Sequence, residues 1–84
     1  MIAFHDLFPQ APTHILIIPK QHYTTLNDVP AEDGAILGEL MTTAAQLSKE
    51  LGFAESGYRV VMNCNADGGQ SVYHIHLHLL AGRR

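Results

Sequence analysis

Tyr73-His74-Ile75-His76-Leu77-His78-Leu79-Leu80, near the end of the chain, alternates histidine with bulky apolar residues. This alternation has the two-residue period of a β-strand. On a strand the three histidines project from one face, and the opposite face, which buries against the body of the domain, carries Tyr73, Ile75, Leu77 and Leu79. Neighbouring side chains on one face lie about 6.6 Å apart, so the outer two histidines are expected roughly 13 Å apart.

A row of imidazoles suits proton transfer or covalent chemistry, because imidazole is nucleophilic and changes its charge near physiological pH. A single histidine on an exposed strand face would be an ordinary polar residue, whereas three at strict spacing favour a functional site. A metal site is the alternative, since His-x-His on a strand is a common zinc arrangement. A span of roughly 13 Å keeps the three from sharing one ion. The one cysteine provides no thiolate cluster, so a metal would need two histidines and a remote third ligand.

The residues before the histidines, Asp67-Gly68-Gly69-Gln70-Ser71, form a turn signal between two apolar runs. Glycines let backbone N–H groups approach a ligand closely, and Gln70 and Ser71 add side-chain donors. Asp-Gly is also an ordinary hairpin turn, so the loop alone indicates little. Beside three aligned histidines it predicts a cradle for a phosphate group.

The motif residues resemble a known family. His74–Leu80 matches in full the histidine triad pattern, His-φ-His-φ-His-φ-φ with φ apolar. Gly68–Tyr73 resembles the Hint branch of that superfamily, the nucleoside phosphoramidases. Three segments further upstream also resemble the Hint branch, namely Ala3–Asp6, Pro9–His14 and Ile18–Lys20. The resemblance runs from about Ile2 to Gly82. It implies an α+β fold and a purine nucleotide ligand such as AMP, and it requires no metal and no cofactor.

The resemblance also implies catalytic roles for five residues. His76 would be the nucleophile that attacks the α-phosphorus and forms a nucleotidyl-histidine intermediate. His74 and His14 would orient it. His78 and Ser71 would contact the phosphate or leaving group and assist proton delivery. Neutral imidazoles beside one another are competent nucleophiles, so these roles agree with the chemistry of the residues.

The same resemblance implies a set of nucleotide-binding residues. Gly69, Gln70 and Asn63 would hold the phosphate. Asp6 would accept hydrogen bonds from the ribose hydroxyls, and Phe4 would line the base pocket. Relatives carry an N-terminal helix and hairpin before the position of Ile2, and a short tail beyond that of Arg84. A nucleotide-binding or scaffold module with negligible turnover is therefore a second hypothesis, and a histidine-based metal-binding protein is a third.

Composition and charge limit the other possibilities. Hydrophobic residues make up 46% of the 84 residues and charged residues 15%, which fits one globular domain spanning residues 1–84. Five basic against eight acidic residues give a net charge of −3, which argues against a nucleic-acid polymer as partner. One cysteine excludes an internal disulfide. We find neither a signal peptide nor a membrane-spanning stretch, and therefore expect a cytoplasmic protein.

The rest of the chain predicts the elements around the histidine strand. Strands are expected over Met1–His5, Thr13–Ile18 and Tyr58–Cys64, and a helix with one apolar stripe over Pro30–Leu51. The run Thr13–Ile18 is largely apolar except at His14 and is expected to be buried on both faces. A lone histidine at such a position is more often a satisfied core residue than a catalyst. The order strand, strand, helix, strand, strand predicts an antiparallel sheet with the long helix on one face. So small a domain leaves unpaired strand edges, which favours a homodimer.

Overall fold

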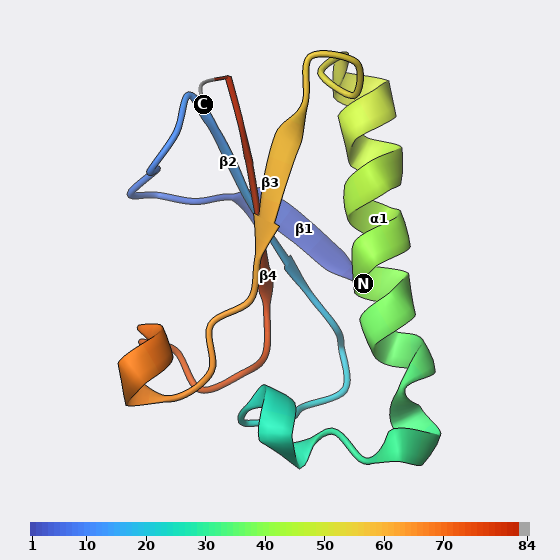
Figure 1. Ribbon diagram of the computed structural model, residues 1–84, viewed down its shortest axis with the longest axis vertical. Helices are drawn as coiled ribbons and strands as arrows, with labels where there is room; N and C mark the ends of the chain where they lie inside the picture. Colours follow the sequence, from blue (N-terminus) through green and yellow to red (C-terminus); the bar gives the residue numbers. More distant parts are fainter. Residues whose placement is uncertain (83–84) are drawn as a thin grey trace.

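The computed structural model describes residues 1–82 and consists of one antiparallel sheet with a long helix alongside it (Figure 1). The strands are β1 (Ile2–His5), β2 (Thr13–Ile18), β3 (Tyr58–Val61) and β4 (Leu77–Ala81), in the spatial order β1-β2-β4-β3. The helix is α1 (Ala35–Leu51). Short 3₁₀ turns lie at Leu26–Asp28, Ala31–Asp33 and Ala66–Gly68. The predicted α+β fold and the order of its elements are confirmed.

The two central strands, β2 and β4, divide their side chains between two different environments. Ile15 and Ile17 of β2, and Leu77 and Leu79 of β4, belong to the buried core, which α1 completes with Leu40 and Ala44. In the antiparallel register His14 lies opposite Leu80, and Leu16 lies opposite His78. Directly opposite residues share a face of the sheet. One face therefore packs on α1, and the other carries histidines.

The helix starts later than its sequence pattern predicts. Residues Ala31–Asp33 form a separate 3₁₀ turn, and α1 begins at Ala35 instead of near Pro30. The Asp33 carboxylate accepts a hydrogen bond from the Tyr23 hydroxyl at 2.6 Å, which ties this turn to the preceding segment. At the other end Gly52 has φ 88°, and Phe53 N–H donates to Ser48 O at 3.0 Å. This is a Schellman ending, as the glycine predicts.

The histidine strand is shorter than the alternation predicts. β4 begins at Leu77, so Tyr73 to His76 have irregular backbone. Tyr73 is 45% exposed and is not part of the core, contrary to the prediction. His14 is one of the most buried side chains in β2 and both of its ring nitrogens are hydrogen-bonded, as expected of a satisfied core histidine. β3 ends at Val61, before Cys64. Within residues 1–82 no helix is long and apolar enough to cross a membrane.

Candidate active site

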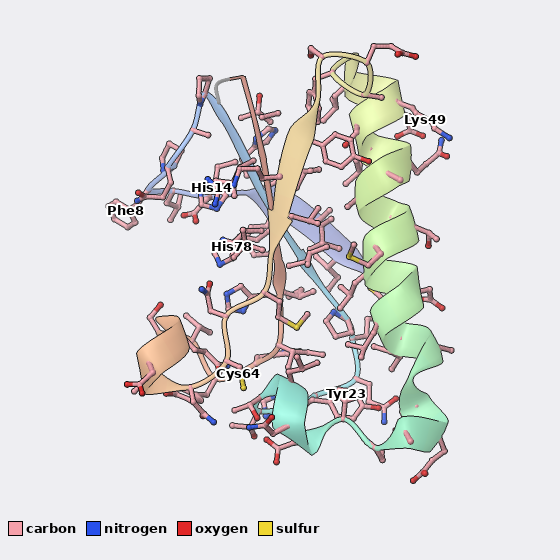
Figure 2. All side chains as sticks on the ribbon, viewed as in Figure 1. Phe8, His14, Tyr23, Lys49, Cys64 and His78 are labelled. Atoms are coloured by element: carbon pink, nitrogen blue, oxygen red, sulfur yellow. The ribbon has the colours of Figure 1, made fainter. Side chains whose placement is uncertain are left out.

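A cavity of about 470 Å³ opens on the face of the sheet opposite α1. Figure 2 shows His14 and His78 on this side of the molecule. β2 contributes His14 and Leu16 to the cavity, and β4 contributes His78. The remaining lining comes from the connections, with Asp6, Phe8, Gln10, Asn63, Gly69, Ser71, Val72 and His76. Polar side chains from segments far apart in the sequence therefore converge on one space.

His76 is held with a defined proton position. Its Nδ1 lies 2.8 Å from the backbone oxygen of His74. A carbonyl oxygen only accepts, so Nδ1 must carry the proton and donate it. In the neutral ring the lone pair is then on Nε2, and the ring lines the cavity. His76 therefore presents an unprotonated nitrogen of the kind that nucleophilic catalysis requires.

His78 is held with the opposite proton position by a chain of hydrogen bonds. The backbone N–H of Gln10 donates to Nδ1 of His14 at 2.9 Å, so the neutral His14 ring carries its proton on Nε2. That nitrogen lies 2.8 Å from Nδ1 of His78 and 3.5 Å from a carboxylate oxygen of Asp6. His78 Nδ1 is therefore the acceptor, and its proton is on Nε2. The third histidine of the motif therefore carries a hydrogen-bond donor at Nε2.

The environment keeps His78 uncharged. Burial lowers the pKa of His78 below its usual 6.5, and the neighbouring His76 and His14 lower it further. The Asp6 carboxylate opposes this shift without reversing it. The ring centroids of His76 and His78 are 4.9 Å apart, and those of His14 and His78 are 5.1 Å apart. Near neutral pH a neutral imidazole can donate a hydrogen bond from its N–H and can take up a proton at its free nitrogen.

His74 does not share the cavity with the other two histidines of the motif. Its Nε2 donates to the backbone oxygen of Pro19 at 3.1 Å, and its ring contacts that of His22 edge to face at 4.8 Å. Its contribution to the site is its own carbonyl, which fixes His76. His14 bonds to His78, not to His76. The two predicted orienting residues are thus close to the site, but they act on different rings. His74 holds His76, and His14 holds His78.

The turn before the histidines borders the cavity. Gly69 adopts φ 78°, a left-handed conformation that glycine adopts without strain, and Gly69 and Ser71 both line the space. Asn63 lies across from them, and its side-chain Nδ2 donates to Gly68 O at 2.6 Å. Asn63 therefore fixes the shape of the turn as well as lining the cavity.

Two predicted nucleotide-binding residues do not line the cavity. Gln70 is 7% exposed and does not line the cavity; its amide bonds to the backbone at Thr24, Asn65 and Val72. Phe4 is 46% exposed and borders a small groove near Leu47 instead. The family resemblance implied a place at the site for both, but only the tertiary structure determines which way each side chain points.

A second cavity of about 560 Å³ adjoins the first on the same face. The two cavities share His14, His78, Asn63 and Gln10. The second adds Arg59 of β3, which lies opposite Leu80. Sequence reasoning missed Arg59, although its position two residues from Val61 in a predicted strand places both on one face. The site thus has room on either side of His78.

The described residues also bring together one set of possible metal ligands. Atoms of Asp6, His14 and His78 lie within 4.8 Å of one another. This set differs from the three motif histidines considered in the sequence. His14 Nε2 and His78 Nδ1 share a proton at 2.8 Å, which an ion would have to displace before it could bind both nitrogens. The observed contacts satisfy these side chains as a hydrogen-bond chain.

Comparisons with known proteins agree with this architecture. The model of the HIT domain family matches residues 1–84. The chain is 58% identical over 81 residues to the purine nucleoside phosphoramidase of Escherichia coli strain K12, covering 96% of this chain and 68% of that protein.

Two solved structures are also similar. One is a HIT family hydrolase from Legionella pneumophila, with TM-score 0.94 and 55% identity, covering 98% of this chain and 73% of that one. The other is a histidine triad protein from Clostridium difficile, with TM-score 0.95 and 46% identity, covering 98% and 71%.

Proposed function

The chain belongs to the HIT domain family and is a hydrolase of that family, and on this premise we propose that it cleaves purine nucleoside phosphoramidates. The observation that carries the proposal is the 2.8 Å hydrogen bond from His76 Nδ1 to the His74 carbonyl, which leaves the Nε2 lone pair for attack. The E. coli relative, 58% identical, is named a purine nucleoside phosphoramidase, which supports the choice of substrate.

In the first step His76 Nε2 attacks the α-phosphorus, and the phosphorus–nitrogen bond to the amine breaks. The amine leaves with a proton from a water molecule, because a neutral amine is a far better leaving group than its anion, and the Nε2–H of His78 can hydrogen-bond the departing group. The His76 ring becomes positively charged as its new bond to phosphorus forms. The His74 carbonyl, which already accepts from Nδ1, stabilises that charge. The product of this step is a nucleotidyl-histidine.

In the second step the hydroxide left by that water molecule attacks the nucleotidyl-histidine, and the bond between phosphorus and His76 Nε2 breaks. His78 stays neutral, with its proton on Nε2, through both steps. The products are the amine and a nucleoside monophosphate. The relay through His14 keeps His78 in the required tautomer, since Gln10 N–H fixes the proton on the far nitrogen of His14.

Substrate would be held by groups on the cavity wall. The left-handed turn at Gly69, with Ser71 and Asn63, offers donors for the non-bridging phosphate oxygens. Asp6 would accept from the ribose, in competition with its present contact to His14 at 3.5 Å. Phe4 lies opposite Leu16 in the sheet register, and Leu16 lines the cavity. The exposed ring of Phe4 would therefore contact a base at the rim of the cavity.

The proposal extends to the assembly and the compartment of the protein. We infer a homodimer, because β3 is an edge strand of the sheet and an unpaired edge favours pairing with a second copy. The exposed Met41 and Leu51 of α1, at 50% and 52%, add apolar surface that a partner would cover. A single half-buried Cys64 suits the reducing cytoplasm, where we place the protein.

A turnover assay tests the proposed reaction. Native protein is incubated with adenosine monophosphate joined to a fluorescent amine, and release of amine and AMP is followed. We expect His76→Ala to lower kcat by more than about 1,000-fold, because the covalent route is lost. His5→Ala is the matched control, since His5 is exposed on β1 and lies outside the cavity. Equal rates for native protein and His76→Ala would remove His76 from the role of nucleophile.

A further inference from the structure

The side chain of Gln70 is buried inside the turn that borders the cavity. Its Oε1 accepts from the backbone N–H of Asn65 at 2.8 Å. Its Nε2 donates to Thr24 O at 2.9 Å and to Val72 O at 3.1 Å, which uses both amide hydrogens. Because all three partners are backbone atoms, this one amide fixes the path of three chain segments.

One of these segments carries backbone strain. Asn65 has φ 58° and ψ −174°, and it is the one non-glycine residue with positive φ in the part of the chain that the structure describes. Backbone near these angles is adopted almost only by glycine and persists only where the surroundings hold it. Gln70 holds Asn65 twice, through Oε1 and through its own N–H, which donates to Asn65 O at 3.0 Å.

Further hydrogen bonds extend this restraint to the histidines. Ile75 N–H donates to Tyr23 O at 2.8 Å, and His74 Nε2 donates to Pro19 O at 3.1 Å. Together with the bond from Gln70 to Thr24, they anchor the irregular stretch before β4 to a segment about fifty residues earlier. Gln70 also lies between Gly69 and Ser71, both of which line the cavity.

We propose that Gln70 is a positioning residue for the phosphate-binding turn. Its buried amide holds the strained backbone at Asn65 and thereby places Gly69 and Ser71 on the cavity wall. Gln70 itself does not contact the substrate. This role rests on the proposed function and deepens it, because the turn is the part of the site that would receive the α-phosphate.

The role makes a distinctive prediction for paired variants. Gln70→Ala releases Asn65 from its strained conformation, so the turn relaxes and kcat for the adenosine phosphoramidate falls about 10- to 100-fold, within the range typical of lost positioning. Asn65→Gly removes the strain, so the turn keeps its shape without the amide. We therefore expect Asn65→Gly in the Gln70→Ala background to regain at least about tenfold of the lost kcat. Gln46→Ala, on the exposed face of α1, is the matched control and should change neither kcat nor stability appreciably.

The experiment combines these rates with thermal melting and amide hydrogen exchange of each variant at Gly69, Ser71 and Ile75. Positioning predicts faster exchange at these amides in Gln70→Ala and slower exchange again in the double variant. A lower Tm with unchanged kcat and KM of the folded protein would show a purely structural role and overturn the proposal. A lower kcat with unchanged exchange and no rescue by Asn65→Gly would indicate direct substrate contact, and would overturn it equally.

Calorimetric titration with AMP separates this proposal from the proposed function. If native protein binds AMP without turning over the phosphoramidate, the proposed function fails, while weaker AMP binding by Gln70→Ala with recovery in the double variant supports the positioning role. If AMP binding is the same in native protein and Gln70→Ala, the positioning role is overturned whatever the turnover. A native protein that neither binds AMP nor turns over substrate overturns both.

Discussion

His76 and His78 are two residues apart, yet they carry their protons on different ring nitrogens. His76 donates from Nδ1 to a backbone carbonyl, whereas His78 accepts at Nδ1 from His14. The same residue type therefore supplies a lone pair at one position and an N–H hydrogen-bond donor at the other. Attack on phosphorus uses both forms at once, because one ring attacks while the other can hydrogen-bond the phosphate or the leaving group. The tautomers are set by hydrogen-bond partners, since the rings themselves are chemically identical.

The lowered pKa of His78 gives a prediction for stability against pH. Above about pH 6.5, the usual value, His78 is neutral in both folded and unfolded chains and contributes no pH dependence. As the pH falls from there towards the lower pKa of the folded state, the unfolded chain binds a proton that the folded chain does not. The free energy of unfolding contributed by this group therefore decreases as the solution is acidified through that window.

Urea unfolding between pH 5 and pH 8 measures this effect. We expect His78→Gln to flatten the acid decline in stability relative to native protein, because the buried titrating group is gone. His5→Gln removes an exposed histidine and should leave the decline unchanged. An equally steep decline in His78→Gln and native protein would contradict the assignment. The neighbouring Asp6, His14 and His76 remain in all three proteins, so the comparison measures the removal of His78 together with its contacts to them.

At the scale of the elements, the ends of α1 and of β4 each depend on a glycine with left-handed backbone. Gly52 ends α1 with φ 88°, and a Cβ there would meet nothing within 4 Å. Gly82 follows β4 with φ 98°, and a Cβ there would lie 2.8 Å from Cβ of Pro12. The first glycine is required by backbone conformation alone, and the second by conformation and by close packing.

Alanine substitutions separate these two causes. We expect Gly52→Ala to lower the free energy of unfolding by about 1–2 kcal/mol, the cost of a left-handed alanine. Gly82→Ala should cost more, because the new methyl group also collides with the proline ring. Gly38→Ala is the control of opposite sign, since Gly38 lies inside α1 with open space around it, and should gain about 0.5–1 kcal/mol. Equal losses for Gly52→Ala and Gly82→Ala in urea unfolding would show that the contact with Pro12 relaxes at no cost.

At the scale of the whole molecule, the sheet has two edges of different character. β1 is exposed at every residue, and β3 at the other edge borders the larger cavity through Arg59 and Val61. A two-fold pairing through β3 would extend the sheet and enclose that cavity, so the space beside His78 would be completed by a second copy.

Light scattering at micromolar concentration tests this assembly. The chain has a mass of 9.2 kDa, and we expect a particle of about twice that mass for a two-fold pair. Val61→Glu, at the edge strand, replaces an apolar side chain by a charge, so it places like charges near the two-fold axis and should shift the mass towards the monomer. Lys49→Gln, on the exposed C-terminal turn of α1, changes the net charge equally and serves as the control. A native mass near 9.2 kDa at these concentrations would contradict the homodimer.

The sequence by itself determined the elements and their arrangement. The β-branched run of Thr13–Ile18 coincides with β2, and Gly52 ends the helix where its pattern stops. The alternation after His74 predicted a strand, and β4 holds its second half. These features depend on local periodicity and on the backbone preferences of single residues, so they are legible in the chain without its fold.

Only the tertiary structure decided how the site residues are oriented. The two-residue period assumes extended backbone, but Tyr73 to His76 follow a path set by hydrogen bonds to Pro19, Tyr23 and Thr24. That path turns His74 away from the cavity and buries the amide of Gln70. The proton positions of His76 and His78 likewise depend on a carbonyl and on His14. Such partners are dozens of residues away or belong to the backbone, so no local pattern of side chains contains them.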